Sequence, residues 1–365
     1  MTKDYSKDLI KGINKDLKQE IAYCLGDTET PTDISDYVSS GNTLLDINIS
    51  NKANGGFPCN RLSEIHGEPS SGKSLIAIHS LKDTQQKGGI GVLIDTENAT
   101  DENLLKTLGV DINKNFIYAQ PDSVESVFNF IEKIAIKTRD IDGFNKIVTI
   151  VWDSIAATPT DAELKADYDE NTMAIQARKL SLGCRKLIKQ IGVRKICLIF
   201  INQMRMDLKK TFGDPYITPG GKAVPFHSSV RVRVFKGKEL RNAAGQPIGV
   251  HTRTKVEKNK IAIPFREAEF DIYFNKGIDD LGSWQPILGN YKIIEPAGSK
   301  GNALRLSKIG IDKPDIFFTK DNFTKTIGQC PEIVAALKTK VEELSIINPN
   351  SEQMNEAVQE EEKPE

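Results

Sequence analysis

The sequence predicts an α/β fold in which a mostly parallel central sheet has helices on both of its faces. Two observations support this prediction. Strand-like and helical segments alternate from residue 62 to about residue 275, and several of the strand-like segments are apolar along almost their whole length. Strands that alternate with helices form parallel sheets, and strands that are buried on both faces have continuous apolar runs.

Each element is predicted from its own pattern. The segments KIVTIVWD and KICLIFIN are almost continuously apolar, which is typical of strands in the middle of a sheet. The later strands have short connections and alternating patterns such as RVRVF, which predict an antiparallel extension. The expected strands are 62–67, 92–95, 116–119, 147–152, 196–202, 230–235, 252–257 and 269–274, and the expected helices are 73–86, 101–108, 123–138 and 171–190.

The regions on either side of this core have a different character. We expect an amphipathic helix within residues 1–25 and a polar linker at 26–36, followed by the core at 37–281. Residues 282–350 mix strand-like and helical pieces and predict a small α+β domain, and the acidic residues 351–365 predict a disordered tail. The first helix is predicted from the helical spacing of Leu9, Ile10, Ile13, Leu17, Ile21 and Leu25. Its apolar stripe packs either on the protein's own core or on a neighbouring subunit.

Composition excludes several classes of protein. The net charge of the 365 residues is -1, so any affinity for nucleic acid must come from local patches. The charged N-terminus has no apolar segment of the kind found in secretory signals, and the apolar run ICLIFI is too short to span a bilayer, so we expect no membrane partner. The five cysteines are scattered and predict free thiols in a reducing compartment, which we take to be the cytoplasm.

The segment GEPSSGKS joins the first predicted strand to the first predicted helix and predicts a phosphate site. Glycines let backbone N–H groups turn around phosphates, and the start of the following helix favours an anion. Lys73 places a charge on the β- and γ-phosphates, and the Ser74 hydroxyl is a ligand for Mg²⁺. An incidental Gly/Ser turn is the alternative, which the complete motif disfavours. The motif comprises Gly67, Glu68, Pro69, Ser70, Ser71, Gly72, Lys73 and Ser74.

Three carboxylates at strand ends are candidates for the rest of this site. Asp153 ends an apolar strand and either supports Mg²⁺ through water or caps a helix. Asp95 and Glu97 are two residues apart at the end of another strand, which predicts that they point to the same face. Glu97 lies further toward the carboxyl end, where open α/β sheets bind ligands, and is the better candidate for positioning water. Either acid is equally compatible with a structural role.

Taken together, these residues resemble the RecA recombinase family. The resemblance runs from about residue 39 to about residue 279, through GEPSSGKS, IDTEN, WDSIAA, LIFINQMRM, TPGGKA and KVEKNKIAIPFREAEF. It implies a RecA-like ATPase core with ATP and Mg²⁺ as cofactors. It also implies a helical filament of the protein with itself on single-stranded DNA and strand exchange with homologous double-stranded DNA. Single-strand-binding and loader proteins are further candidate partners.

The resemblance assigns roles to particular residues of the nucleotide site. It implies that Glu97 is the water-activating base and that Gln203, a polar amide at the tip of an apolar strand, senses the γ-phosphate. Lys258 and Lys260 would reach the γ-phosphate of a neighbouring subunit, although a solvated strand face is the alternative. Asp101 matches an acid on the adenine side, whereas Leu104 stands where the family usually has a stacking tyrosine. Phe226 matches an aromatic residue at the family's subunit contact.

Two long segments, 158–173 and 204–221, have no clear strand or helix pattern, and each follows a predicted strand. Loops of this length are usually functional. The second segment mixes basic with apolar residues, which suits phosphates and unstacked bases. The resemblance makes both segments DNA-binding loops. Its implied DNA contacts are Met173, Arg178, Arg185, Arg205, Met206, Leu208, Gly220 and Gly221, for each of which a solvated surface position is the alternative.

The C-terminal region matches the family poorly. By analogy with the family, its basic residues are expected to gather duplex DNA, although scattered basic residues usually serve solubility. These residues are Lys292, Lys300, Arg305, Lys308 and Lys313. Two alternative functions share the same core, namely a helicase that unwinds DNA without joining homologous molecules and an accessory ATPase that does not exchange strands. A small-molecule kinase would need an acceptor pocket and a lid, for which the sequence has no signal.

Overall fold

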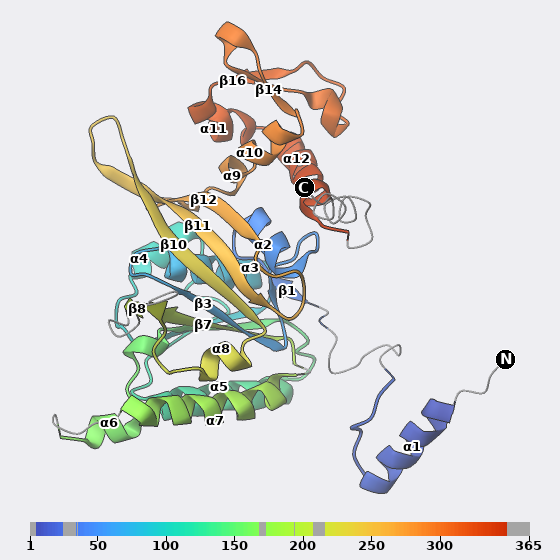
Figure 1. The fold of residues 1–365 in the computed structure, drawn as a ribbon, viewed down its shortest axis with the longest axis vertical. Coiled ribbons are helices and arrows are strands. Elements are labelled where there is room, and N and C mark those ends of the chain that lie inside the picture. Colours follow the sequence, from blue (N-terminus) through green and yellow to red (C-terminus); the bar gives the residue numbers. More distant parts are fainter. Residues whose placement is uncertain are drawn as a thin grey trace, which may run out of the picture. The chain divides into compact units, whose positions relative to one another are not determined.

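The computed structural model describes residues 5–24, 34, 36–167, 173–192, 194–206 and 216–348 and is shown in Figure 1. The chain forms two units, residues 1–35 and 36–365, and each is described by itself. Most of the predicted linker, parts of both predicted DNA loops (168–172 and 207–215), Leu208 and the acidic tail lie outside the described residues. The side chains of Met173 and Met206 also lie outside them.

The first unit contains helix α1 (Tyr5–Leu17), which is shorter than predicted. The chain leaves the helix at Lys18, whose φ of 50° is left-handed. The Asn14 side chain then accepts hydrogen bonds from the backbone N–H groups of Ile21 and Ala22, which holds the chain in a turn. The apolar side chains of α1 that are most exposed within the chain are Tyr5, Leu9 and Leu17.

The second unit contains a nine-stranded sheet in the order β13-β12-β11-β10-β3-β7-β6-β4-β5. The six strands from β10 to β5 are parallel to their neighbours, and β10 to β13 form an antiparallel extension. The predicted α/β fold class is therefore confirmed. The strands are β3 (Arg61–Gly67), β4 (Ile90–Asp95), β5 (Phe116–Ala119), β6 (Val148–Asp153), β7 (Ile196–Gln203), β10 (Val230–Arg241), β11 (Pro247–Asn259), β12 (Glu267–Tyr273) and β13 (Gly277–Ile278).

The hairpin of β10 and β11 extends several residues beyond the predicted strands. Beyond Phe235 the sequence becomes polar and the side chains are mostly exposed, so the periodic apolar signal ends. The two strands nevertheless remain paired as far as Arg241 and Pro247, with register shifts along the way. Backbone hydrogen bonds rather than burial hold this part of the hairpin together.

Helices cover both faces of the sheet. One face packs on α2 (Thr43–Ser50), α3 (Lys73–Gln86) and α4 (Glu102–Leu108), and the other packs on α5 (Val124–Asp140), α7 (Met173–Ile191) and α8 (Ala223–His227). Helices α5 and α7 lie side by side (Figure 1). The bounds of α3 are those predicted, whereas α2 was not predicted, because its almost completely buried side chains lack amphipathic periodicity.

Short elements occupy the two segments that were expected to be irregular. A 3₁₀ turn (Ile155–Ala157) directly precedes the first segment, and the segment itself contains α6 (Asp161–Lys165), which corrects the prediction that it has no helix. Helix α6 begins at a capping box in which Thr160 and Glu163 bond each other's backbone N–H groups. The second segment contains the antiparallel pair β8 (Arg205–Met206) and β9 (Tyr216–Ile217). Another short pair, β1 (Tyr37–Val38) and β2 (Phe57–Pro58), precedes the main sheet.

The region after residue 279 has its own small sheet and its own apolar core around Trp284, Phe323 and Leu337. The elements are α9 (Asp280–Ser283), α10 (Gln285–Asn290), β14 (Ile294–Pro296), β15 (Asn302–Leu304), β16 (Ile316–Phe318), α11 (Phe323–Ile327) and α12 (Pro331–Ser345), with 3₁₀ turns at Gly298–Lys300, Leu306–Ile309 and Lys320–Asn322. Helix α12 packs on α2 of the core.

Three of the basic residues expected to gather duplex DNA are engaged inside this region. Arg305 bonds both Glu295 and Asp315, Lys308 bonds Glu295, and Lys313 bonds Glu332. All five cysteines are free thiols. Within the described parts of the chain, every helix is too short or too polar to cross a membrane.

Candidate nucleotide and DNA sites

The GEPSSGKS segment forms a tight loop between β3 and α3. Ser70 and Gly72 have φ values of 59° and 100°. A Cβ atom on Gly67 would lie 2.2 Å from the Val234 carbonyl oxygen of the neighbouring strand, so this position requires glycine. Lys73 Nζ donates to the Glu68 carbonyl oxygen at 2.6 Å, which places the charged group at the loop. Burial lowers the pKa of Lys73, and the charges of Asp153, Glu97 and Glu68 act in the opposite direction.

Ser74 and Asp153 lie together beside this loop. The Ser74 hydroxyl bonds the Asp153 carboxylate, whose pKa is raised to about 6 by burial, with a further contribution from Glu97. Mg²⁺ is usually held by one or two carboxylates and hydroxyls together with phosphates and water. A buried carboxylate with other acids nearby favours a cation, so the residues present fit this ion. Among the described residues, the buried Ser71 hydroxyl has no hydrogen-bond partner and is a further polar group of the loop.

The structure separates the roles of Asp95 and Glu97. Strand β4 ends at Asp95, so the two-residue alternation does not reach Glu97 and the prediction of a shared face does not hold. Asp95 accepts hydrogen bonds from the backbone N–H groups of Glu97 and Thr100 and from the Tyr118 hydroxyl. It therefore shapes the turn that presents Glu97.

Glu97 meets two side chains from other strand ends. Its Oε1 accepts a hydrogen bond from Gln203 Nε2 at 2.7 Å and another from the Ser154 hydroxyl. Gln203 comes from the end of β7, and Ser154 directly follows β6. The sequence predicted Glu97 and Gln203 separately, and the parallel sheet brings their side chains together. A carboxylate and an amide thus meet at the carboxyl edge of the sheet, close enough to Lys73 for its charge to interact with that of Glu97.

The adenine side of the site is less clearly defined by the predicted residues. Asp101 caps α4 by accepting from the Asn103 N–H, and Leu104 packs partly against the core. A cavity of about 480 Å³ lies on another side of the phosphate loop, between Ser70–Leu75 and the extended hairpin. The hairpin and the residue that follows β12 complete its lining, with Lys236, Glu239, Pro247, Gly249, Val250 and Phe274. No local motif marks these residues, because sheet topology alone brings them to the loop.

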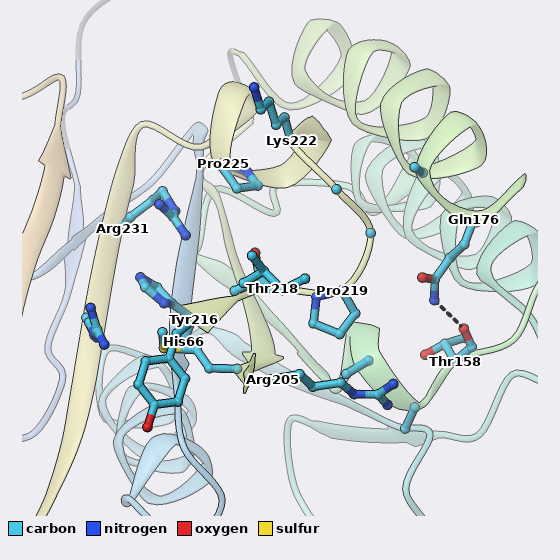
Figure 2. A pocket seen from close by; sticks show the side chains of 18 of the residues that line it. His66, Thr158, Gln176, Arg205, Tyr216, Thr218, Pro219, Lys222, Pro225 and Arg231 are labelled. Atoms are coloured by element: carbon cyan, nitrogen blue, oxygen red, sulfur yellow. Dashed lines mark hydrogen bonds between the residues drawn. The ribbon is translucent and has the colours of Figure 1, made fainter. Parts of the chain in front are cut away.

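The two predicted DNA loops line a second cavity, of about 890 Å³ (Figure 2). Gln176 of α7 faces Thr158 there and donates to its carbonyl oxygen and to that of Ile155. At the end of the second loop, Gly220 has a φ of 83° and rests on α7, since an added Cβ would lie 2.4 Å from Leu180 Cδ1. The end of the second loop therefore packs on the helix that follows the first.

Three of the predicted DNA contacts, Arg205, Gly220 and Gly221, line this cavity. Arg205 lines the cavity at the start of the second loop and is exposed, as are Arg178 and Arg185 on α7. Gly220 and Gly221 line the opposite end of the second loop. The backbone of Met173 opens α7 and that of Met206 ends β8.

Lys258 and Lys260 lie beside α8. Lys258 Nζ donates to the carbonyl oxygens of Pro225 and Phe226. Phe226, which was predicted at a subunit contact, has a side chain that is 71% exposed in the chain. Strand β11 ends at Asn259, so Lys260 lies beyond it, which corrects the prediction that both lysines belong to one strand face. Burial lowers the pKa of His227, and the charges of Arg185 and of both lysines lower it further, so these groups form one cationic cluster.

Comparison with known proteins gives a consistent result. The family model described as RecA N-terminal domain matches residues 5–279, which end directly before α9. The chain is 34% identical to Protein RecA of Synechocystis sp. over 312 residues, which are 85% of this chain and 82% of that protein. It is 36% identical to Protein RecA of Leptospira biflexa over 304 residues (80% and 75% of the two chains). It is 32% identical to Protein RecA of Thermus thermophilus over 337 residues, or 92% of each chain.

Proposed function

The chain belongs to the RecA family of recombinases, and from that premise we propose that it is a DNA-stimulated ATPase whose turnover accompanies strand exchange. It forms a helical filament of its own copies on single-stranded DNA and pairs that strand with homologous duplex. As a DNA-acting protein with free thiols, it works in the cytoplasm of a bacterium or of a phage-infected host.

The observation that carries this proposal is the contact of Gln203 with Glu97 beside Lys73 and Asp153. Lys73 and the backbone of the loop would bind the phosphates. Ser74 and Asp153 would hold Mg²⁺, which would neutralise part of the phosphate charge. Glu97 would accept the proton of the attacking water, as a general base within hydrogen-bond reach of it.

Gln203 would couple the nucleotide to the second DNA loop. With ATP bound, its amide would exchange the Glu97 carboxylate for the γ-phosphate, which frees Glu97 for catalysis. After phosphate release the amide would return to Glu97. Because Met204 and Arg205 follow Gln203 directly, this exchange would move the start of the second loop between two arrangements.

Lys258 and Lys260 would complete the site of the neighbouring subunit. Cations delivered in trans are worth on the order of 10³–10⁵ in the rate of phosphoryl transfer. An isolated subunit would lack them, so hydrolysis would depend on the filament. The exposed Phe226 beside Lys258 and the exposed apolar side chains of α1 would supply contacts between subunits.

Two further parts of the proposal concern ligands. DNA phosphates would bind Arg205 at the cavity that both loops line, and Arg178 and Arg185 on the exposed side of α7. The 480 Å³ cavity would take the nucleoside, so that Phe274 contacts the base in place of an aromatic residue at position 104. Asp101 would contact the adenine side only if it leaves its capping bond.

The proposal is tested by measuring ATP hydrolysis with and without single-stranded DNA, for the unaltered protein and for Lys73→Ala. We expect DNA to stimulate the unaltered protein and Lys73→Ala to be inactive in both conditions. Hydrolysis that is indifferent to DNA would contradict the proposal. Strand exchange with homologous duplex then separates a recombinase from a helicase or from an accessory ATPase.

A further inference from the structure

We propose that a polar cluster, formed by the buried Glu64 and Asn202 with the half-buried Arg231 and Glu257, is a positioning device that links the γ-phosphate sensor to the second DNA loop and to Lys258. The inference rests on the proposed function, because it assumes that Gln203 responds to the nucleotide. None of the four side chains would touch the nucleotide. We call them the Glu64 cluster.

Glu64 is the centre of the cluster and is completely buried on β3. Its Oε2 accepts from Arg231 Nε on β10 at 2.6 Å, and its Oε1 accepts from Asn202 Nδ2 on β7 at 3.1 Å. One carboxylate therefore ties together three adjacent strands through their side chains. Replacing a buried ion pair by apolar residues is often neutral or stabilising, so stability alone does not account for such a group.

Asn202 connects this carboxylate to the second DNA loop. Its Nδ2 also donates to the Pro219 carbonyl oxygen at 3.2 Å, directly before Gly220. Asn202 is the residue before Gln203, and because alternate residues of a strand point to opposite faces, the two side chains lie on opposite faces of β7. A movement of Gln203 toward a phosphate would therefore shift the amide that holds Pro219. Within the described residues Asn202 Oδ1 is buried and has no partner, so the amide is not locked on every side.

Glu257 connects the cluster to Lys258. Arg231 pairs with Lys258 and Val232 pairs with Val256, so Glu257 is an extra residue and a β-bulge places it, with Lys258, opposite Arg231. Its Oε2 lies 3.8 Å from Arg231 Nη1 and 3.1 Å from His66 Nε2. Burial acts to raise the pKa of Glu257, but the adjacent His66 and the charges of Arg231 and Arg233 hold it at about 2. Glu257 is thus ionised and anchors the bulge.

The cluster borders the larger cavity, directly beneath the second loop. Figure 2 shows Arg231 and His66 on neighbouring strands of the cavity wall and Pro219 on the segment opposite. His66 precedes Gly67 of the phosphate loop. Three residues in or next to the cluster, His66, Asn202 and Glu257, are thus each followed directly by a residue of the proposed ATP site. The geometry points to transmission through side chains across the sheet.

The test measures the affinity of the full-length protein for a labelled single-stranded oligonucleotide, with a non-hydrolysable ATP analogue and with ADP. Two variants are compared with the unaltered protein: Glu64→Gln, which removes the charge that holds Arg231, and Asn202→Ala, which removes the bond to Pro219 and leaves the ion pair intact. We expect both to reduce the ratio of the two affinities about tenfold, within the usual range of coupling between sites. Their affinity for the ATP analogue should be unchanged.

The control is Glu269→Gln, the same change at an exposed position of β12 outside the cluster. It should leave the ratio unchanged.

A merely structural role would weaken DNA binding by the same factor with both nucleotides, and that result would overturn the inference. If Glu64→Gln does not fold, the ratio measured for Asn202→Ala decides alone. If the unaltered protein binds DNA equally with both nucleotides, the proposed function fails as well. If the unaltered protein binds DNA more tightly with the ATP analogue than with ADP, and both variants have the same ratio of affinities as it has, only the inference is rejected.

Discussion

Gln203 donates a hydrogen bond to the carboxylate of Glu97 across the carboxyl ends of β4 and β7. In this arrangement the proposed general base is engaged by the proposed sensor of the γ-phosphate. Under the proposed function, such a site would stay inactive until the nucleotide provides another partner for the amide. The contact would then keep the basal rate low and carry a signal to the second loop.

The first prediction concerns the two neighbouring acids. Glu97→Gln should retain ATP binding and lower the turnover rate about 10²–10⁴-fold, the usual contribution of a general base. Steady-state kinetics with saturating single-stranded DNA would measure this. Asp95→Asn is the matched control, since Asp95 holds only the turn. It should instead lower the free energy of unfolding by about 1–3 kcal/mol, through the weakened hydrogen bonds of a buried group. Equal loss of turnover in both variants would contradict the separation of roles.

The second prediction tests whether the lysines act on a neighbouring subunit. Lys258→Ala and Glu97→Gln should each be almost inactive alone. When the two variants are mixed on DNA, some sites combine an intact Glu97 from one subunit with an intact Lys258 from the next. Hydrolysis should then recover partly, in proportion to mixing. If every mixture stays as inactive as the separate variants, Lys258 does not act in trans.

The third prediction follows from the raised pKa of Asp153. Burial raises it from 3.8 to about 6, so the folded protein retains a proton that the unfolded chain has released. The stability contributed by this proton is present below about pH 4 and is lost as the pH rises through about 6. The side chain of Asp153→Asn cannot ionise, so above pH 7 and without nucleotide the variant should have the higher free energy of unfolding. The expected difference is roughly 2–3 kcal/mol, because the pKa of Asp153 changes by about two units on folding. Urea unfolding across this range would show whether the difference disappears in acid.

The fourth prediction concerns the second DNA loop. Gly220→Ala adds a Cβ that meets Leu180 at a left-handed φ of 83°, so the loop end must move away from α7. We expect weaker binding of single-stranded DNA with unchanged nucleotide affinity. Gly245→Ala is the matched control, because its φ is 78° but nothing lies within 4 Å of the added atom. It carries the same backbone strain, of order 1–3 kcal/mol, at the tip of the β10–β11 hairpin. Equal DNA affinities would separate the loop end from DNA binding.

The fifth prediction concerns the nucleoside. Stacking of a base on an aromatic side chain is worth about 1–3 kcal/mol, so Phe274→Ala should weaken ATP binding roughly tenfold or more. Its affinity for inorganic triphosphate should not change, because the phosphate loop is untouched. Phe265→Ala, at another exposed phenylalanine, is the control. A similar loss for both ligands would place Phe274 outside the base site.

The sequence was sufficient where a local pattern determines the structure. Helix α3 and strand β5 have the predicted bounds, because an apolar run or a phosphate motif marks both ends. The sequence also predicted that the candidate residues at strand ends would gather at one edge of the sheet, because the carboxyl edge of a parallel sheet collects them. The sequence favoured Glu97 over Asp95 by position alone, and it left open whether either acid is structural, because only the fold shows which backbone groups reach each carboxylate.

Other features depend on contacts between distant segments and have no local signal. Glu64 lies inside a strand that the sequence predicts to be buried. Nothing near it in the sequence indicates that Asn202 and Arg231 will bond its carboxylate. The wall of the 480 Å³ cavity likewise comes from a hairpin whose outer half looks like a polar loop. Helix α2 was missed because a helix that is buried on all sides has no polar face to reveal its period.

Asp280 begins the region that the RecA N-terminal domain does not cover, yet it belongs structurally to the start of α2. Its carboxylate accepts hydrogen bonds from the backbone N–H and hydroxyl of Thr43, 237 positions earlier. Trp284 and Asn42 donate to the same carboxylate. Proteolysis at the family boundary would thus remove the carboxyl group that accepts hydrogen bonds from the amino end of an early helix. The excised core should melt at a lower temperature than the intact chain, and adding back the severed piece should restore part of the loss.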